Sequence, residues 1–391
     1  MHNDGVLINV SVPRLLEPPA QSFFLFGPRG TGKSTWLKTA LPSAVRIDLL
    51  DESLFQELLV QPGLLAQMLQ KMPPGAWVVI DEVQRLPNLL NEVHRAIEER
   101  RLKFALSGSS TRKLKRAGVN LLGGRAERLT MYPFVPQELK EHFGLEDALR
   151  WGTLPIVLAS PNPEKALAAY TQLYVREEIQ AEALVRNLSA FARFLPVAAL
   201  FHAQVLNISS LARDAAVQRN TVNDYIQILE DTLLAWRLPA FEARLRVRER
   251  RHPKLYWVDA GLVRALKRQL GDVAEEERGP LFEGLVAMML REHLERVGDI
   301  DALSYWASAH VEVDFILRRR KTLVAIEVKA ATRLRDAELT GLRAVAELKE
   351  VRRRVFVYRG TRSFRTDDGI EVMSFGDFSR ELASGALMST R

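Results

Sequence analysis

The chain contains no cysteine, which excludes disulfide bonds and zinc sites built on thiolate ligands. It also lacks the uninterrupted apolar run of about 18 residues that a membrane-spanning helix needs. Its first residues, MHNDG, do not combine a basic region with an apolar one, so a secretory signal is not expected. Together these absences predict a soluble cytoplasmic protein with no membrane partner.

The chain does have an ordinary globular composition, with 47% hydrophobic and 26% charged residues in 391 positions. A chain of this length is expected to form roughly two to four domains. Its net charge of +7 is concentrated in four basic runs, which are residues 112–116, 244–251, 318–321 and 352–354. Any one of these runs can be a solvated helix face, but four together favour contacts with the phosphates of DNA.

The strongest motif is GPRGTGKS at residues 27–34, a phosphate loop. It follows an apolar run at 23–26, which predicts a strand, and precedes a predicted helix over 33–41. In this context backbone N–H groups bind phosphates, Lys33 reaches the β- and γ-phosphates of ATP, and Ser34 binds Mg²⁺. The residues expected to contact the nucleotide are Gly27, Pro28, Arg29, Gly30, Thr31, Gly32, Lys33, Ser34 and Thr35.

Two acidic residues end the next apolar run, WVVIDE at 77–82. A buried parallel strand enters an active site in this way. Asp81 is expected to hold the water shell of Mg²⁺, and Glu82 to polarise the attacking water, which favours ATP hydrolysis over phosphate transfer to another metabolite. A further strand is expected over 103–107, and the hydroxyls of Ser107 and Ser109 at its end are candidates to sense the γ-phosphate, although a plain turn fits as well.

An arginine in a glycine-flanked turn, Arg125, precedes another expected strand at 128–132. It is a candidate arginine finger that reaches the nucleotide of a neighbouring subunit. Arg112 competes for this role, and a surface arginine after a tight turn is the alternative for Arg125.

Five segments carry a resemblance to a known family: GPRGTGKST, VVIDEVQRLP, LSGSSTRKL, LGGRAERL and YPFVPQEL. The chain resembles a family of prokaryotic predicted AAA+ superfamily ATPases that carry a C-terminal restriction-endonuclease-like domain of uncharacterised role. The resemblance implies that Arg125 acts as the finger in trans. It also implies a homo-oligomer, for which a hexameric ring is the expected form.

Residues 208–229 have the spacing of a helix-turn-helix. The expected core positions are Leu211, Ala212, Ala215, Val222, Ile226 and Leu229, and the expected exposed positions are Arg219, Asn220, Thr221, Asn223 and Gln227. Strands at 233–238 and 254–258 would form a wing. We interpret this region as a DNA-contacting winged helix, with a packing or protein-docking module as the alternative.

Two strand-like stretches, 311–317 and 322–329, predict a hairpin. Pairing across it can bring Asp314 beside Glu327 and Lys329, and Glu283 lies on an apolar helical stretch upstream. These four residues resemble the site of PD-(D/E)-x-K nucleases, in which Glu283, Asp314 and Glu327 would bind Mg²⁺ and Lys329 would stabilise developing charge. Val313 stands where that motif has proline. A buried salt-bridge network around Lys329 is the alternative.

The sequence therefore predicts an α/β protein with a phosphate-loop AAA+ core, a parallel sheet and a helical lid, then a winged helix-turn-helix, then a restriction-endonuclease-like α/β domain. The expected boundaries are 1–19 for an N-terminal arm, 20–135 for the core, 136–190 for the lid, 191–265 for the winged helix and 266–391 for the nuclease-like domain. The expected activity is Mg²⁺-dependent ATP hydrolysis coupled to remodelling or cleavage of single-stranded, duplex or branched DNA. Two alternatives remain: an ATP-controlled DNA-binding switch with an inactive nuclease fold, and a protein-docking or remodelling ATPase.

Overall fold

The structure is a computed structural model that describes residues 12–110, 112, 123–174, 187–241, 252–299, 302–308 and 311–388. The chain forms two compact units. The phosphate-loop unit comprises Pro13–Pro133 together with the short segment Ile228–Leu234. The larger unit holds the rest, chiefly Phe134–Gln227 and Ala235–Arg391.

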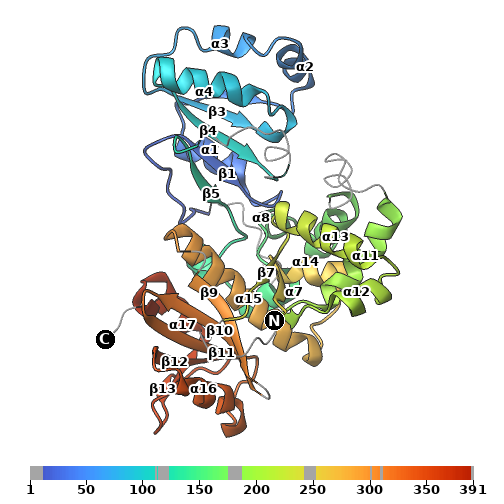
Figure 1. The fold of residues 1–391 in the computed structure, drawn as a ribbon, viewed down its shortest axis with the longest axis vertical. Helices are drawn as coiled ribbons and strands as arrows, with labels where there is room; N and C mark the ends of the chain where they lie inside the picture. The colour runs from blue at the N-terminus through green and yellow to red at the C-terminus, as the bar shows by residue number, and fades with distance from the viewer. Residues whose placement is uncertain are drawn as a thin grey trace. The chain divides into compact units, whose positions relative to one another are not determined.

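The phosphate-loop unit is built on a parallel five-stranded sheet with the order β2-β3-β4-β1-β5 (Figure 1). The strands are β1 (Phe23–Phe26), β2 (Val45–Asp48), β3 (Trp77–Asp81), β4 (Lys103–Gly108) and β5 (Glu127–Thr130). The prediction of an α/β protein with a parallel sheet is confirmed. The last strand was expected over 128–132 and ends two residues earlier.

Helices cover both faces of this sheet. They are α1 (Lys33–Ala40), α2 (Glu52–Val60), α3 (Leu64–Met68) and α4 (Leu89–Arg100). Phe23 of β1 packs in one apolar cluster with Leu37 of α1, whereas the next residue, Phe24, packs in a second cluster with Leu90 of α4. Successive strand residues point to opposite faces, so the uninterrupted apolar run of β1 is explained by burial on both sides.

The larger unit begins with short helices and a small antiparallel sheet of order β6-β8-β7. Its helices in this part are α6 (Pro136–Leu139), α7 (Leu145–Trp151), α8 (Pro155–Leu158), α9 (Pro163–Ala169), α11 (Leu188–Leu200), α12 (Ile208–Asp214), α13 (Arg219–Asp231, of which the last four residues are grouped with the phosphate-loop unit) and α14 (Ala260–Leu266). The strands are β6 (Gln204–Val205), β7 (Ala235–Leu238) and β8 (Lys254–Trp257). In the described part of the chain, no helix is long and apolar enough to cross a membrane.

A mixed six-stranded sheet of order β13-β14-β12-β11-β10-β9 forms the C-terminal part of the larger unit (Figure 1). Its elements are α15 (Glu275–Arg296), β9 (Leu303–Ser308), β10 (Val311–Arg319), β11 (Thr322–Lys329), α16 (Thr340–Ala344), β12 (Val351–Tyr358), β13 (Phe364–Arg365), β14 (Glu371–Ser374) and α17 (Phe375–Ala383). The predicted hairpin of β10 and β11 is confirmed as an antiparallel pair, and β11 pairs in parallel with β12.

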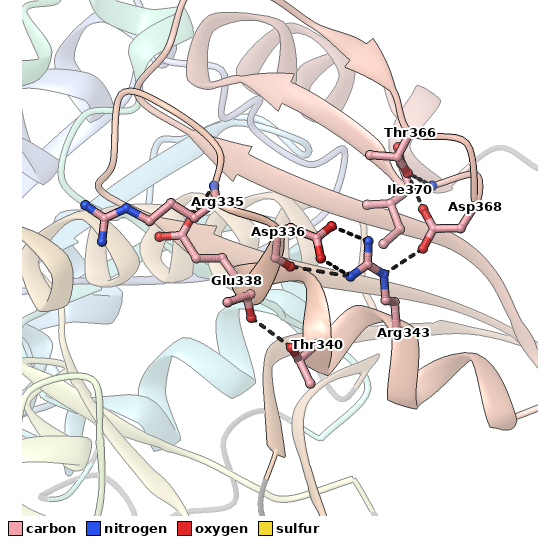
Figure 2. Close-up of polar contacts among 9 residues, drawn as sticks. Arg335, Asp336, Glu338, Thr340, Arg343, Thr366, Asp368 and Ile370 are labelled. Carbon is pink, nitrogen blue, oxygen red and sulfur yellow. Dashed lines mark hydrogen bonds and ion pairs between the residues drawn. The ribbon is translucent and has the colours of Figure 1, made fainter.

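An exposed ion-pair network ties α16 to the loop before β14 (Figure 2). The guanidinium of Arg343 binds both carboxylate oxygens of Asp336, at 2.6 and 2.9 Å, and its Nε donates to Asp368 at 2.9 Å. Thr366 Oγ1 donates to the other oxygen of Asp368 and accepts from the N–H of Ile370. A two-pronged arginine contact of this kind orients the elements it joins, so we attribute a structural role to it.

Candidate functional site

The phosphate loop joins β1 to α1 through glycines at positions where a residue with a side chain would be strained or would clash. Gly30 and Gly32 have positive φ angles of 74° and 86°, which residues with a side chain rarely adopt. At Gly27 the constraint is space, because a Cβ atom there would lie 2.4 Å from the carbonyl oxygen of Met131. The spacing of the motif is therefore explained by the path of the loop.

Lys33 is the first residue of α1, and it is buried against the loop that precedes it. Its ammonium group donates hydrogen bonds to the carbonyl oxygens of Gly27, at 2.7 Å, and Pro28, at 3.2 Å. Thr31 Oγ1 donates to the same Pro28 carbonyl at 2.7 Å. Arg29 and Thr35 are exposed at the two ends of this turn. A buried cation at the N-terminus of a helix is a suitable environment for phosphate.

Ser34 and Asp81 meet at the carboxyl edge of the parallel sheet. The Ser34 hydroxyl, in α1, donates to Oδ2 of Asp81, the last residue of β3, at 2.5 Å. Asp81 Oδ1 accepts from the Ser107 hydroxyl at the end of β4 and from the N–H of Glu82 at 3.2 Å. Hydroxyl and carboxylate oxygens are the ligands that Mg²⁺ takes beside nucleotide phosphates. The residues present therefore fit a Mg²⁺ ion bound together with ATP.

Glu82 is held by a side chain that the sequence did not single out, Gln84. The Gln84 amide donates to a carboxylate oxygen of Glu82 and, at 3.2 Å, to the hydroxyl of Ser109. Glu82 itself adopts a left-handed backbone conformation with φ of 57°. Gln84 is 5% exposed, and a Cβ atom at Gly108 would lie 2.4 Å from its Oε1. The Gln84 amide thus links Ser109, directly after β4, to the Glu82 carboxylate that is proposed to polarise water.

The two arginine-finger candidates lie in different surroundings. Arg125 forms an ion pair with Glu98 on the surface, where the two side chains are 41% and 49% exposed. Arg112 lies 3.4 Å from Asp231, and its side chain is 15% exposed. Because Arg125 is the more exposed of the two, it is the better placed to reach another molecule. Both roles remain predictions.

In the larger unit, Asp314, Glu327 and Lys329 come together as the hairpin predicted. The Lys329 ammonium contacts a carboxylate oxygen of Glu327 and lies 3.7 Å from Asp314 Oδ2. That oxygen also accepts from the N–H of Val328 at 2.9 Å. The pairing of β10 with β9 shifts register between Val313 and Ile316, and such bulges re-aim side chains near active sites.

Glu283 joins this cluster, and so does Lys254 at the start of β8, which the sequence did not single out. The Lys254 ammonium lies 3.0 Å from Glu283 Oε1, 3.2 Å from Asp314 Oδ1 and 2.5 Å from Glu312 Oε1. Tyr256, on the same strand, donates its hydroxyl to Glu283 Oε1 at 2.6 Å. Among the described residues, no group of three or more histidines, cysteines and acids is arranged to hold a metal ion. The metal site at these carboxylates remains a prediction.

The carboxyls of this cluster differ in their protonation. Burial, reinforced by the nearby Asp314 carboxylate, raises the pKa of Glu283 to about 7 and that of Glu327 to about 8. Burial would also raise the pKa of Asp314, but the ammonium groups of Lys254 and Lys329 outweigh it and hold that pKa below its usual value. For Lys254 the surrounding carboxylates outweigh burial in the same way and raise its pKa. At neutral pH this site therefore contains two ammonium groups and an ionised Asp314.

The segment with helix-turn-helix spacing forms α12 and α13, and all six expected core positions are buried. Of the expected outer positions, Thr221 is half-buried and the other four are exposed: Arg219, Asn220, Asn223 and Gln227. Beside them lies a hollow of about 530 Å³, lined in part by Arg193, Arg213 and Gln218. The strands expected for a wing are β7 and β8, which pair antiparallel. The winged-helix interpretation and its DNA contact remain predictions.

The four basic runs differ in exposure and in their contacts. The run at 318–321 is exposed at the turn between β10 and β11. In the run at 352–354, Arg353 is half-buried and forms ion pairs with Glu371 and Glu381 at 2.8 and 2.9 Å, so it supports the fold instead of an open basic surface. The run at 244–251 and most of the run at 112–116 lie outside the described residues.

Three family descriptions match consecutive parts of the chain. Residues 20–140 match a family described as AAA domain. Residues 143–272 and 278–378 match two families described as domains of unknown function, DUF8612 and DUF4143 respectively. We call residues 20–140 the AAA domain, after the family that they match. With the geometry of Lys33, Ser34 and Asp81, this match supports a phosphate-loop AAA+ ATPase.

Similar proteins include the uncharacterized proteins Mb2031c of Mycobacterium bovis and Rv2008c of Mycobacterium tuberculosis. Each is 26% identical over 356 residues, which cover 88% of this chain and 78% of the relative. Among solved structures, the Aeropyrum pernix Orc1 protein in complex with DNA aligns over 65% of this chain and 87% of its own, with 14% identity and a TM-score of 0.27. The replication initiator DnaA, bound to AMPPCP and single-stranded DNA, aligns over 55% and 84%, with 14% identity and a TM-score of 0.26. Scores of this size do not establish a common fold.

Two polar residues of these sites were not identified from the sequence. Gln84 of the AAA domain stands two positions after Glu82, and a buried amide this close to an acidic pair is a weak signal of a hydrogen-bond partner. Lys254 opens an apolar strand, where a lysine needs a carboxylate partner if it is buried. Neither signal identifies the distant partner, which is Ser109 for Gln84 and Asp314 for Lys254.

Proposed function

We propose that the AAA domain hydrolyses ATP with the aid of Mg²⁺. The observation that carries the proposal is the 2.5 Å contact between Ser34 and Asp81, with Glu82 as the next residue. Ser34 and Asp81 would hold the metal ion, which when bound supplies positive charge to the phosphate oxygens. Lys33 binds the β- and γ-phosphates in exchange for its present carbonyl partners, and Glu82 orients the attacking water.

The test compares three variants for ATP binding and turnover. We expect Lys33→Ala to lose binding and turnover together, because it removes the phosphate-contacting cation. Glu82→Gln is expected to bind ATP normally and to lose turnover, because the amide cannot take a proton from water. The matched control is Lys38→Ala, since Lys38 is an exposed lysine of the same helix. If Glu82→Gln turned over ATP like the wild type, Glu82 would not be the water-orienting residue.

We further propose that the larger unit acts on DNA, and that the hydrolysis of ATP is coupled to this action. Support comes from the exposed polar face of α13, with Arg219, Asn220 and Asn223, and from the exposed basic turn at 318–321. Such groups suit phosphate and base-edge contacts. Binding to labelled DNA should weaken steeply as salt is added, because phosphate contacts release counterions. If the affinity for DNA did not change with salt concentration, phosphate contacts would be excluded and the protein-docking alternative would be favoured.

Cleavage of DNA is a second candidate function, favoured by one observation. Lys329 contacts Glu327 and lies 3.7 Å from Asp314 on the adjacent strand, an arrangement that a PD-(D/E)-x-K site would require. Wild type and Lys329→Ala should be incubated with Mg²⁺ or Mn²⁺ and with single-stranded, duplex and branched DNA. Nicking that Lys329→Ala loses would support cleavage. Equal nicking by both would assign the activity to a contaminant, and no nicking would favour the ATP-controlled binding switch.

Assembly into a homo-oligomer, with a hexameric ring as the expected form, completes the proposal. Arg125 would leave its surface ion pair with Glu98 to reach the nucleotide of a neighbouring subunit. Exposed pairs of this kind contribute little, about 0–1 kcal/mol, so exchanging the partner is inexpensive. Specific ATPase activity should rise with protein concentration, and Arg125→Ala should abolish this rise while leaving the activity at the lowest concentrations unchanged. Activity that is independent of concentration in a protein that sediments as a monomer would refute the trans role.

A further inference from the structure

Lys254 is the most deeply buried cation in contact with the C-terminal carboxylates. It is 2% exposed, and its ammonium lies within 3.2 Å of oxygens from three acids: Glu283, Glu312 and Asp314. A lysine is almost never this buried unless carboxylates compensate its charge. Its position at the centre of these oxygens is the position that a bound cation would take.

The lysine and the carboxylates come from different elements of the larger unit. Glu312 and Asp314 lie on β10 and Glu283 lies on α15, whereas Lys254 is the first residue of β8 in the small antiparallel sheet. Tyr256, two positions along the same strand, also bonds to Glu283. Residues two apart on a strand share a face, so β8 presents both groups to the cluster. Whether an ammonium group lies among the carboxylates therefore depends on the position of β8.

Lys254 contacts oxygens of two of the three carboxylates that are proposed to bind metal, Glu283 and Asp314. Mg²⁺ binds carboxylate oxygens at about 2.0–2.1 Å and demands near-octahedral geometry. A metal ion on Glu283 Oε1 and Asp314 Oδ1 would stand a few ångströms from the ammonium, in a buried place where like charges repel strongly. The residues as arranged therefore do not fit a divalent ion while Lys254 is present.

One acceptor in the cluster remains without a partner. Glu327 is 6% exposed, and its Oε2 atom is buried and forms no hydrogen bond with the described residues. Its other oxygen contacts Lys329. A buried carboxylate oxygen in this state is costly and marks a place where a ligand or proton is wanted. The cluster therefore keeps the capacity to receive a cation.

We propose that Lys254 is an internal cation that excludes divalent metal from this site, and that metal binds Glu283, Asp314 and Glu327 only when the Lys254 side chain is withdrawn. The inference rests on the proposed cleavage function for its biological meaning, because it makes β8 an inhibitory strand of that site. The exchange of one cation for another does not itself depend on cleavage.

The test measures Mn²⁺ binding to the full chain without nucleotide, by the loss of the free-ion electron paramagnetic resonance signal. All variants carry Asp81→Asn, so that the phosphate-loop site does not contribute. We expect Lys254→Met to bind one Mn²⁺ per chain at least about tenfold more tightly than the parent. The matched control Lys254→Arg keeps the cation and should bind no better than the parent. Adding Asp314→Asn to Lys254→Met should abolish the new site.

Several outcomes would overturn the inference. They are equal Mn²⁺ binding by the parent and Lys254→Met, absent binding by a folded Lys254→Met chain, and tighter binding that persists with Asp314→Asn. If Lys254→Met folds only when Mn²⁺ is added, as followed by circular dichroism, the metal has replaced the ammonium and the inference stands. A variant that stays unfolded at saturating Mn²⁺ counts against it. Cleavage is scored separately: a variant that binds Mn²⁺ without cutting DNA removes the cleavage proposal alone.

Discussion

Replacing Gly108 by alanine perturbs the polar contacts around Glu82 without touching the nucleotide loop. The added Cβ atom would lie 2.4 Å from Gln84 Oε1 and 3.3 Å from its Cδ. Carbon and oxygen atoms normally approach no closer than about 3.4 Å, so the amide must move by about 1 Å. Gly108 does not have a positive φ angle, so alanine causes no backbone strain there. Any loss of stability or activity should therefore come from displacement of the Gln84 side chain.

The magnitude follows from the two hydrogen bonds of the Gln84 amide. The bond to the Glu82 carboxylate is worth about 1.5–3 kcal/mol, and the neutral bond to Ser109 about 0.5–1.5 kcal/mol. Because a displaced amide can regain part of this from water, we expect Gly108→Ala to lower the free energy of unfolding of the AAA domain by about 2 kcal/mol. The Glu82 carboxylate, which accepts a hydrogen bond from this amide, should shift with it, and a misplacement of about 1 Å should lower kcat for ATP by about 10- to 100-fold.

The assay is a double-mutant cycle with Gln84→Ala. Hydrogen exchange of peptides that cover β4 reports the stability of the AAA domain separately from the larger unit. In the Gln84→Ala background the clash is gone, so Gly108→Ala should be neutral or should stabilise by up to about 1 kcal/mol. The affinity for ATP should change little in all three variants, because Lys33 and the loop are intact.

Two results would refute this reasoning. If Gly108→Ala destabilised the domain equally with and without the Gln84 side chain, the cost would have another origin, since independent effects add. If it reduced the affinity for ATP while kcat stayed constant, the Gln84 amide would serve nucleotide binding instead of the orientation of Glu82.

Two further predictions concern the larger unit, and both are read from the exchange protection of its strands. Gly152→Ala should destabilise it by more than about 3 kcal/mol, because the φ angle is positive and the new Cβ atom would lie 2.0 Å from Asp259 Oδ1. The matched control is Gly298→Ala, because Gly298 also has a positive φ angle but has open space around it, and it should lower the free energy of unfolding by only about 1 kcal/mol. If the two variants were destabilised equally, the clash with Asp259 would be excluded as the cause. Burial lowers the pKa of His202 from 6.5 to about 3, so the unfolded chain binds one more proton between these values and stability falls as the pH is lowered through them. His202→Gln should reduce the slope of unfolding free energy against pH by about 1.4 kcal/mol per pH unit between these values. An unchanged slope would show that His202 is not the residue responsible.

The sequence by itself determined the elements whose signals are local. The glycines of the phosphate loop, the strand before it and the helix after it follow from short-range backbone requirements, and the acidic pair 81–82 follows from the end of a buried strand. Parallel strands place their carboxyl ends on one edge, which is why Ser34 and Asp81 could be expected to meet. The alternation of β10 and β11 likewise predicted that Asp314 would lie beside Glu327.

Only the tertiary structure decided which side chains complete these sites. Gln84 reaches Glu82 because Gly108, the last residue of β4, leaves room for its side chain. Lys254 enters the carboxylate cluster from a separate sheet, 60 positions before Asp314 in the chain. Contacts of this range depend on how packed elements approach one another, and no spacing or periodicity encodes that approach. The same limit applies to the cation at the C-terminal site: the sequence supplied carboxylates that suit Mg²⁺, and the packing of β8 put an ammonium group among them.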